Sequence, residues 1–353
     1  MNDNGYVNWS DVKETWYNQY TNYGEASLNV IRHLFEPEKF FAEESTTVNM
    51  PIFTGKDPIT QERVFLIHSL VCAQLQQMLA LVTNRRGLPD PVMPSFQRQN
   101  YIELSPCNID NPQAYKKMEK EVAKMNKGRD RLRVAKEELK LAHALIEAKQ
   151  YVFVSLDIEA YEEDHSILLE IGWSIYDSKT DLYMDQHYIN SSYRHLVNGK
   201  YVDNQKLRFQ FGTSVWCTLK QALEELRKDL DWAVERDGGF VLVGHGLDSD
   251  IKYLATQKFK WPGRCINGSG SGSGGRGGDV DNVRISAAVA ILNTDTMYGA
   301  SIGNPTNPPS LGTTLSKVGI DAWCLHNAGN DAHYTLLLFM TLINSTRATH
   351  GSG

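Results

Sequence analysis

Two acidic residues stand at the end of a strongly apolar stretch near the middle of the chain. Residues 152–156 (VFVSL) are typical of a buried strand, and Asp157 and Glu159 follow at alternate positions. Because side chains alternate along a strand, both carboxylates project from the same side. Neighbouring carboxylates repel each other and lose solvation on burial, and a bound cation relieves both costs. A lone D-x-E is more often an ordinary strand end, so a metal site needs matching acids elsewhere.

A matching acid follows a second apolar strand. Residues 244–250 (GHGLDSD) leave that strand through two glycines and enter the start of a helix. Asp250 then lies one turn into the helix and faces the strand ends. We expect His245 to be structural or to support the ligands from behind, along with Asp295 and His333 further along the chain.

A histidine and another acid precede the last helix. His326 and Asp331 are five residues apart in HNAGND, which on one continuous helix would place them about 140° apart. They converge only if His326 belongs to the loop and Asp331 to the helix. Gly329 makes such a break easy, because glycine adopts backbone conformations that other residues avoid.

In this order, D-x-E, then G-H-x3-S-D, then H-x4-D, the motifs resemble those of the DEDDh exonucleases, the RNase T-like superfamily. The resemblance covers roughly Tyr151 to Asn344. D-x-E-A-Y-E with H-N-A-G-N-D-A is similar to a fungal family linked to an mRNA-export DEAD-box helicase. The exonuclease that partners Argonaute in fungal RNA silencing is another candidate relative. Many members of the superfamily have Thr where this chain has Ala160, and this departure affects the expected substrate contacts rather than metal binding.

The resemblance implies a 3′–5′ exonuclease that acts on RNA more than on DNA, at a free 3′ end. It implies that Asp157, Glu159, Asp250 and Asp331 hold two Mg²⁺ or Mn²⁺ ions about 4 Å apart. His326 would act as general base, a role suited to a side chain that titrates near neutral pH. Several exonucleases of this class are dimers, so a homodimer is compatible with the resemblance. The alternative is a catalytically silent nuclease fold that binds RNA or a protein partner.

The composition is that of a globular protein. The chain has 353 residues and a net charge of −6, and no apolar run approaches the length of a membrane span. We expect no signal peptide at the N-terminus, and five scattered cysteines without C-x-x-C pairs predict reduced thiols in an intracellular compartment, cytoplasm and/or nucleus. The same cysteines argue against a zinc site. The net negative charge argues against a surface that is basic throughout and binds nucleic acid, but it is compatible with a local basic groove.

The N-terminal part divides into two predicted regions. Residues 1–110 are expected to be helical and irregular, with a helix over Gln61–Asn84. Trp16, Tyr20 and Tyr23 share one helix face, which favours a core-facing stripe over a base-stacking platform. These helices either complete the nuclease core or bind a partner such as an RNA helicase or Argonaute. Residues 111–150 predict a long basic helix, either a solvated face or an arm that guides a polyanion.

Residues 151–348 are predicted to form the exonuclease domain. Strands over Ile167–Tyr176 and Leu182–Ile189 extend the first strand into an antiparallel meander, and helices then alternate with the strands Phe240–Gly244 and Ala288–Asn293. This order predicts an α/β fold, a ribonuclease H-like mixed sheet with helices packed on it, preceded by the helical N-terminal region. Residues 267–278 (NGSGSGSGGRGG) are typical of an engineered flexible linker in place of a longer loop, and we expect no function there.

Overall fold

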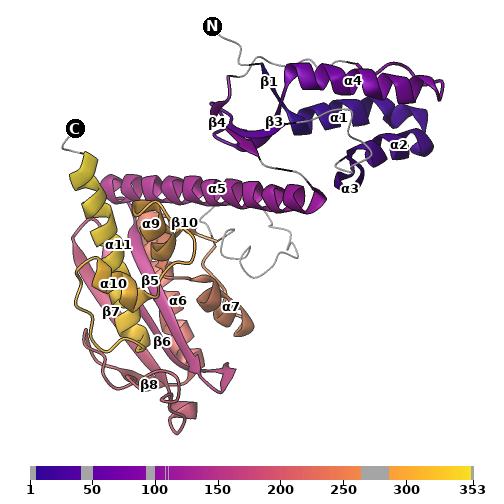
Figure 1. Ribbon diagram of the computed structural model, residues 1–353. Coiled ribbons are helices and arrows are strands. Elements are labelled where there is room, and N and C mark those ends of the chain that lie inside the picture. Colours follow the sequence, from indigo (N-terminus) through magenta and orange to yellow (C-terminus); the bar gives the residue numbers. More distant parts are fainter. Residues whose placement is uncertain are drawn as a thin grey trace, which may run out of the picture. The chain divides into compact units, whose positions relative to one another are not determined.

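The computed structural model describes residues 5–40, 51–92, 100–107, 109, 111–263 and 286–350 (Figure 1). The chain forms two compact units, Met1–Asp130 and Arg131–Gly353. The division falls inside the long helix α5 (Pro112–Ala148), which contributes to both units. The predicted boundaries at residues 110 and 150 stay a proposal. The predicted linker 267–278 lies outside the described residues.

The first unit contains a four-stranded sheet in the order β1-β3-β2-β4, and each pair of neighbours is antiparallel. Its strands are β1 (Tyr6–Asn8), β2 (Ile52–Lys56), β3 (Arg63–His68) and β4 (Ile102–Cys107). The sequence did not predict this sheet. The helix expected from Gln61 begins only at Ser69 and ends at Asn84 (α4), because residues 63–68 pair with strands on both sides.

The helices of the first unit bury the aromatic stripe. They are α1 (Trp9–Tyr20), the 3₁₀ helix η1 (Thr21–Tyr23), α2 (Glu25–Phe35) and α3 (Pro37–Phe40). Trp16 and Tyr20 are fully buried, and they donate hydrogen bonds to the carbonyls of Val92 (2.8 Å) and Pro89 (2.7 Å). Tyr23 is half exposed. The core-facing interpretation is therefore confirmed for the first two residues of the stripe.

Helix α5 matches the long basic helix that was predicted over residues 111–150. Many of its lysines, Lys116, Lys117 and Lys124 among them, are exposed, as a solvated face requires. At its C-terminal end Ala142, Leu145 and Ile146 enter a core of the second unit. Among the described residues, no helix combines the length and apolar character needed to cross a membrane.

The second unit is built on a six-stranded mixed sheet in the order β10-β9-β5-β6-β7-β8. Its strands are β5 (Val152–Tyr161), β6 (Asp164–Asp177), β7 (Leu182–Asn190), β8 (Val215–Cys217), β9 (Phe240–Gly244) and β10 (Ala288–Asn293). β5, β6 and β7 form the antiparallel meander, whereas β9 and β10 run parallel to β5. The predicted α/β mixed sheet is confirmed. The short edge strand β8, parallel to β7, was not predicted.

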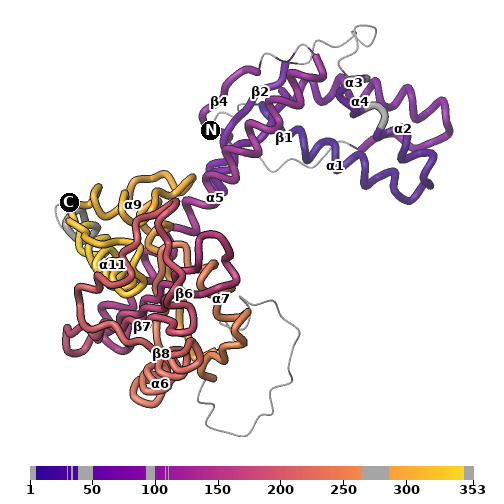
Figure 2. Tube along the Cα trace, turned by 90° about the horizontal axis from the view of Figure 1, so that it is seen from below, coloured from indigo at the N-terminus to yellow at the C-terminus, as the bar shows by residue number. Residues whose placement is uncertain are grey.

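Helices cover both faces of this sheet (Figure 1 and Figure 2). One core contains α6 (Leu219–Asp237) and α7 (Asp248–Thr256), and the other contains α9 (Thr294–Ser301), α10 (Leu311–Lys317) and α11 (Ala328–His350). Along β5, Val154, Leu156 and Ile158 face α6 and α7, while Phe153 faces α11. The alternation of side chains therefore directs Asp157 and Glu159 toward the α11 side.

A glycine in β6 allows α11 to begin against the sheet. Gly172 is the register partner of Asp157. A Cβ at Gly172 would lie 2.3 Å from backbone atoms of Ala328 and Gly329, which is far inside van der Waals contact. Only a residue without a side chain fits here. The start of α11 consequently lies next to the strand position opposite Asp157.

We predict that Gly172→Ala destabilises the protein by on the order of 1–3 kcal/mol, because the new methyl group must displace backbone. Gly128→Ala is the matched control: it lies within α5, its Cβ would meet nothing within 4 Å, and alanine should stabilise the helix by about 0.5–1 kcal/mol. Urea unfolding of both full-length variants measures the difference. A Gly172→Ala protein as stable as the parent would contradict the close approach of α11 to the sheet.

Candidate metal centre

The first two acids lie where the central strand extends beyond its parallel neighbour. The β5–β9 pairing ends at Ser155 and Val243, whereas β5 continues beside β6 with Glu159 opposite Glu170. Asp157 and Glu159 therefore stand on a part of β5 that is hydrogen-bonded on one side only. This edge, at the carboxyl ends of the parallel strands, is where open α/β sheets bind their ligands.

Asp250 closes the open side of β5. It lies in the first turn of α7, and its Oδ1 accepts a hydrogen bond of 3.0 Å from the backbone N–H of Ile158. Ile158 is the residue between the two acids of D-x-E. The contact replaces the ladder bond that β9 no longer supplies, and it places the Asp250 carboxylate beside Asp157 and Glu159.

His326 and Asp331 meet in the manner that the motif required. His326 precedes α11 with a backbone φ of 65°, and its N–H donates to Asp331 Oδ2 at 3.0 Å. Glu159, His326 and Asp331 each offer one ligand atom, and these atoms lie within 4.8 Å of one another. Thus the chain turns at His326 itself, not at Gly329.

Gly329 has a packing role instead of the conformational role that was expected. A Cβ at this position would lie 2.6 Å from the ring of Phe209 and 2.8 Å from the side chain of His187. Glycine therefore lets the first turn of α11 pack against β7 and the loop after it.

Burial and mutual repulsion raise the pKa values of the acids in the cluster. Loss of solvation, followed by the charges of neighbouring acids, raises the pKa of Asp157 far above its usual range. Burial first and then the charge of Asp331 raise the pKa of Glu159 to about 8. Burial raises the pKa of Asp250 to about 7, and burial with the charge of Glu170 raises that of Asp331 to about 7. Close carboxylates with such shifts are typical of functional sites.

The donor set fits a divalent cation. Asp157 Oδ2 and Asp331 Oδ1 are buried and accept no hydrogen bond from the part of the chain that the structure describes. A buried carboxylate oxygen without a partner is costly, and a cation would satisfy it. Oxygen ligands of this kind suit hard ions such as Mg²⁺ and Mn²⁺.

A fifth acid, Glu170, lies behind the cluster and was not predicted from the sequence. Glu170 in β6 is buried; its Oε2 lies 2.9 Å from Nε2 of the buried His187, and Asn327 Nδ2 lies 3.5 Å away. His187 Nδ1 in turn lies 2.8 Å from Ser214 Oγ. The available signal was an acid inside the apolar run 167–171 (ILLEI). These partners keep Glu170 out of the open cluster.

The residues that we expected to be structural have partners within the scaffold. His245 bonds to Thr294 Oγ1 (2.9 Å) and to the Pro309 carbonyl (3.0 Å). His333 Nδ1 lies 2.8 Å from Asp185 Oδ1. Asp295 Oδ1 accepts the N–H of Thr296 at 2.6 Å. None of the three expected structural residues belongs to the ligand group of Glu159, His326 and Asp331.

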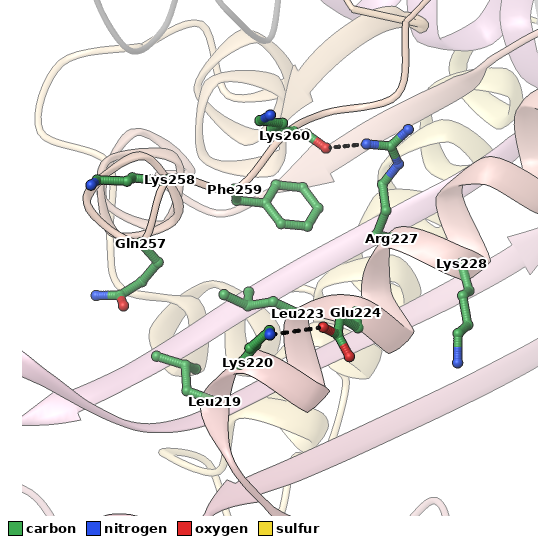
Figure 3. A pocket seen from close by; sticks show the side chains of 10 residues that line it. All are labelled: Leu219, Lys220, Leu223, Glu224, Arg227, Lys228, Gln257, Lys258, Phe259 and Lys260. Carbon is green, nitrogen blue, oxygen red and sulfur yellow. Dashed lines mark hydrogen bonds and ion pairs between the residues drawn. The ribbon is translucent and has the colours of Figure 1, made fainter.

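A separate cleft lies between α6 and the segment after α7 (Figure 3). Its volume is about 780 Å³, and its lining contains lysines and an arginine around the ring of Phe259. Three of the cations form ion pairs with acids on the same helix, namely Lys220–Glu224, Arg227–Asp231 and Lys228–Glu225. The cleft contains none of the motif acids, so we do not assign the chemistry to it.

The mixed sheet and the acids clustered at the carboxyl ends of its parallel strands agree with a nuclease fold of the DEDDh class, and the comparison with known families shows that class. The sequence model of the family described as DNA polymerase III subunit epsilon-like, C-terminal domain (DEDDh), matches residues 152–342. The match covers more than half of the chain, and the chain belongs to this family. Members of this nuclease family generally use divalent metals.

Relatives with similar sequences occur in yeasts. The chain is 32% identical over 215 residues to the Saccharomyces cerevisiae protein named "Good for full DBP5 activity protein 2", which covers 56% of this chain and 36% of the relative. It is 28% identical over 247 residues to an uncharacterised nucleolar protein of Schizosaccharomyces pombe, covering 68% of this chain and 87% of that one. The chain thus spans only about a third of the length of the first relative.

Among solved structures, the RNase domain of the yeast Pop2 protein matches at 13% identity with a TM-score of 0.30. The match covers 61% of this chain and 84% of that domain. A superposition this weak carries no argument about activity.

We predict that the metal-free protein loses stability as pH rises from about 5 to about 8. The folded acids keep their protons up to pH 7–8, whereas unfolded carboxyls release theirs near pH 4. The folded state then binds more protons, so raising the pH favours unfolding. Thermal melting in EDTA measures this slope, and added Mn²⁺ should raise the melting temperature most at pH 8. The control is Asp157→Asn, in which the loss of stability with rising pH and the stabilisation by Mn²⁺ should both be smaller. An equal dependence of melting temperature on pH in the two proteins would contradict the prediction.

Proposed function

We propose that this protein is a metal-dependent 3′–5′ exonuclease that hydrolyses phosphodiester bonds of nucleic acid, RNA in preference to DNA. The observation that carries the proposal is the convergence of acids from three distant segments, with two buried oxygens, Asp157 Oδ2 and Asp331 Oδ1, that have no partner among the described residues. Membership of the DEDDh family supports the nuclease class. The direction and the preference for RNA rest on the family resemblance alone.

In this proposal the four acids would hold two Mg²⁺ or Mn²⁺ ions: Asp157, Glu159, Asp250 and Asp331. Bound ions of this kind neutralise charge on the phosphodiester and make a water molecule more acidic. The chain's own contribution is to fix the acids: the N–H groups of Ile158 and His326 each donate to a carboxylate, which orients Asp250 and Asp331. Fixed ligands lower the reorganisation needed when the substrate binds.

His326 is the proposed general base. Its side chain is exposed and lies within 4.8 Å of ligand atoms of Glu159 and Asp331. Its imidazole would accept a proton from the attacking water as the water oxygen bonds to phosphorus and the bond to the 3′ oxygen breaks. An exposed imidazole next to buried acids supports this role, because water can reach it.

We predict that the full-length protein shortens a 5′-labelled single-stranded RNA stepwise from its 3′ end, only with Mg²⁺ or Mn²⁺. Asp157→Ala should abolish the activity, and His326→Ala should lower kcat by about 10²–10⁴-fold, the usual contribution of a general base. His165→Ala, an exposed histidine on the β5–β6 hairpin, is the matched control and should retain full activity. Gel analysis of the product ladder measures direction and rate.

Degradation that persists in EDTA or in Asp157→Ala would rule out the metal assignment. Tight Mn²⁺ binding without turnover of any RNA or DNA would instead favour the catalytically silent binding module. Parallel reactions on DNA of the same sequence test the preference for RNA.

A protein partner and a location are further parts of the proposal. One relative is named for its effect on DBP5 activity, and another is named nucleolar. We infer an intracellular protein of the cytoplasm and/or nucleus whose N-terminal unit docks an RNA helicase. Co-purification of the full-length chain with a candidate helicase, before and after RNase treatment, distinguishes a protein contact from shared RNA.

A further inference from the structure

An irregular segment connects η3 (Ser191–Tyr193) to β8 and is hydrogen-bonded, at two places, to residues that neighbour the motif acids in the sequence. It runs over residues 194–214, longer than the roughly 12–15 residues beyond which such connections are uncommon unless they serve a function. Within it, residues 198–210 are tied to the segments that carry the motif acids. We name residues 198–210 the strap.

The first tie joins the strap to the end of D-x-E-A-Y-E. Asn198 Nδ2 donates to the carbonyl of Ala160 (2.9 Å), and Asn198 Oδ1 accepts the N–H of Glu162 (3.0 Å). The Glu162 carboxylate accepts backbone N–H groups of three successive strap residues at 2.7–3.1 Å, Gly199, Lys200 and Tyr201. The first residue of the strap is therefore hydrogen-bonded to Ala160, the chain neighbour of Glu159.

The second tie joins the strap to the segment of His326 and Asp331. Asn327 Nδ2 donates to the carbonyls of Gln205 and Lys206, both at 3.1 Å. Asn330 Nδ2 donates to the Arg208 carbonyl (2.9 Å), and Asn330 Oδ1 accepts the Gln210 N–H (2.9 Å). Both asparagines are fully buried. Because both asparagines lie between His326 and Asp331 in the sequence, the strap is hydrogen-bonded to both segments that carry motif residues, the end of D-x-E-A-Y-E and the start of α11.

Exposed aromatic rings lie at both ties. Tyr201 is 71% exposed, and the ammonium of Lys200 lies 5.2 Å from its ring centre. Trp323 is 66% exposed and precedes Cys324, which contacts the strap through Gln210 Nε2 (3.5 Å to Sγ). A scattered exposed ring needs no explanation. These two rings differ from a scattered one because they stand on segments fixed to the motif-bearing elements: the Tyr201 N–H donates to Glu162, and the carbonyl of Cys324, next to Trp323, accepts from Asn330.

We propose that the strap and Trp323 bind the unpaired nucleotides that precede the scissile bond, with bases stacked on Tyr201 and Trp323. This rests on the proposed nuclease function of the same site. Base stacking on aromatic rings is tolerant of sequence and requires a base face that duplex pairing does not occupy. The Lys200 ammonium lies over one face of the Tyr201 ring, 5.2 Å from its centre, and 3.6 Å from the Glu163 carboxylate, so a base would stack on the other face of the ring. The substrate class is therefore a single strand, or a duplex with an unpaired 3′ tail.

The test uses full-length Tyr201→Ala and Trp323→Ala with single-stranded RNA, single-stranded DNA and a blunt duplex. We expect each variant to raise KM for single strands by roughly 5- to 150-fold, the range for one lost stacking contact, with kcat changed little. Tyr201→Phe and Trp323→Phe should restore KM, because they keep the ring. Trp232→Ala is the matched control, since this exposed tryptophan lies toward the far end of α6, beside the start of β9 and away from the acids.

A second substrate separates the strap from the chemistry. The p-nitrophenyl ester of thymidine 5′-monophosphate has no neighbouring base to stack, so the parent, Tyr201→Ala and Trp323→Ala should hydrolyse it at equal rates in Mn²⁺. Unchanged KM for oligonucleotides in both alanine variants would overturn the strap proposal while leaving the nuclease proposal standing.

If the parent hydrolyses neither substrate, the nuclease proposal fails and binding still tests the strap. Fluorescence anisotropy of labelled single-stranded RNA in EDTA then compares the parent with the two alanine variants. A 5-fold or larger loss of affinity in the variants supports the strap, and equal affinities overturn it.

Discussion

Repulsion among buried carboxylates is the constraint on which the second unit depends. Burial and neighbouring charge raise the pKa of each acid in the cluster: Asp157, Glu159, Asp250 and Asp331. Without a cation, the arrangement costs folding free energy whenever the pH favours ionisation. The surrounding fold must supply enough packing to hold the acids together. Two β-sheet faces covered by helices, one with α6 and α7 and one with α11, provide it.

The acids are positioned by backbone groups that would otherwise lack partners. Where β9 diverges from β5, the free N–H of Ile158 is taken by Asp250, and where the chain turns before α11, the N–H of His326 is taken by Asp331. Each contact satisfies a polar group and aims a carboxylate in one step. Gly172 permits this geometry because its missing side chain lets α11 start beside the strand. Hydrogen bonds from the backbone at the edge of the acid cluster thus hold the carboxylates together against their mutual repulsion.

Sequence patterns predicted the second unit better than the first for a physical reason. β9 and β10 begin and end where the apolar runs between turns predicted, because each run is a local signal. In the first unit, residues 63–68 form a central strand only through pairing with distant segments, and their spacing also fits the start of a helix. The motif order pointed to five residues that the structure brings to one edge of the sheet. The sequence did not predict a role for Glu170, because its hydrogen-bond partners come together only when β6, β7 and α11 pack.

Ala160 is the position where this chain departs from the commoner D-x-E-T pattern, and the structure gives the departure a physical setting. Its side chain packs against the core beside Ile158 and Leu156, where a hydroxyl would meet apolar neighbours. Its carbonyl accepts the Asn198 amide and so anchors the strap. Position 160 thus serves packing and the anchoring of a loop. Position 160 therefore offers no side-chain hydroxyl to the terminal nucleotide, and the strap that its carbonyl anchors is the part that we propose to bind the nucleotides before the scissile bond.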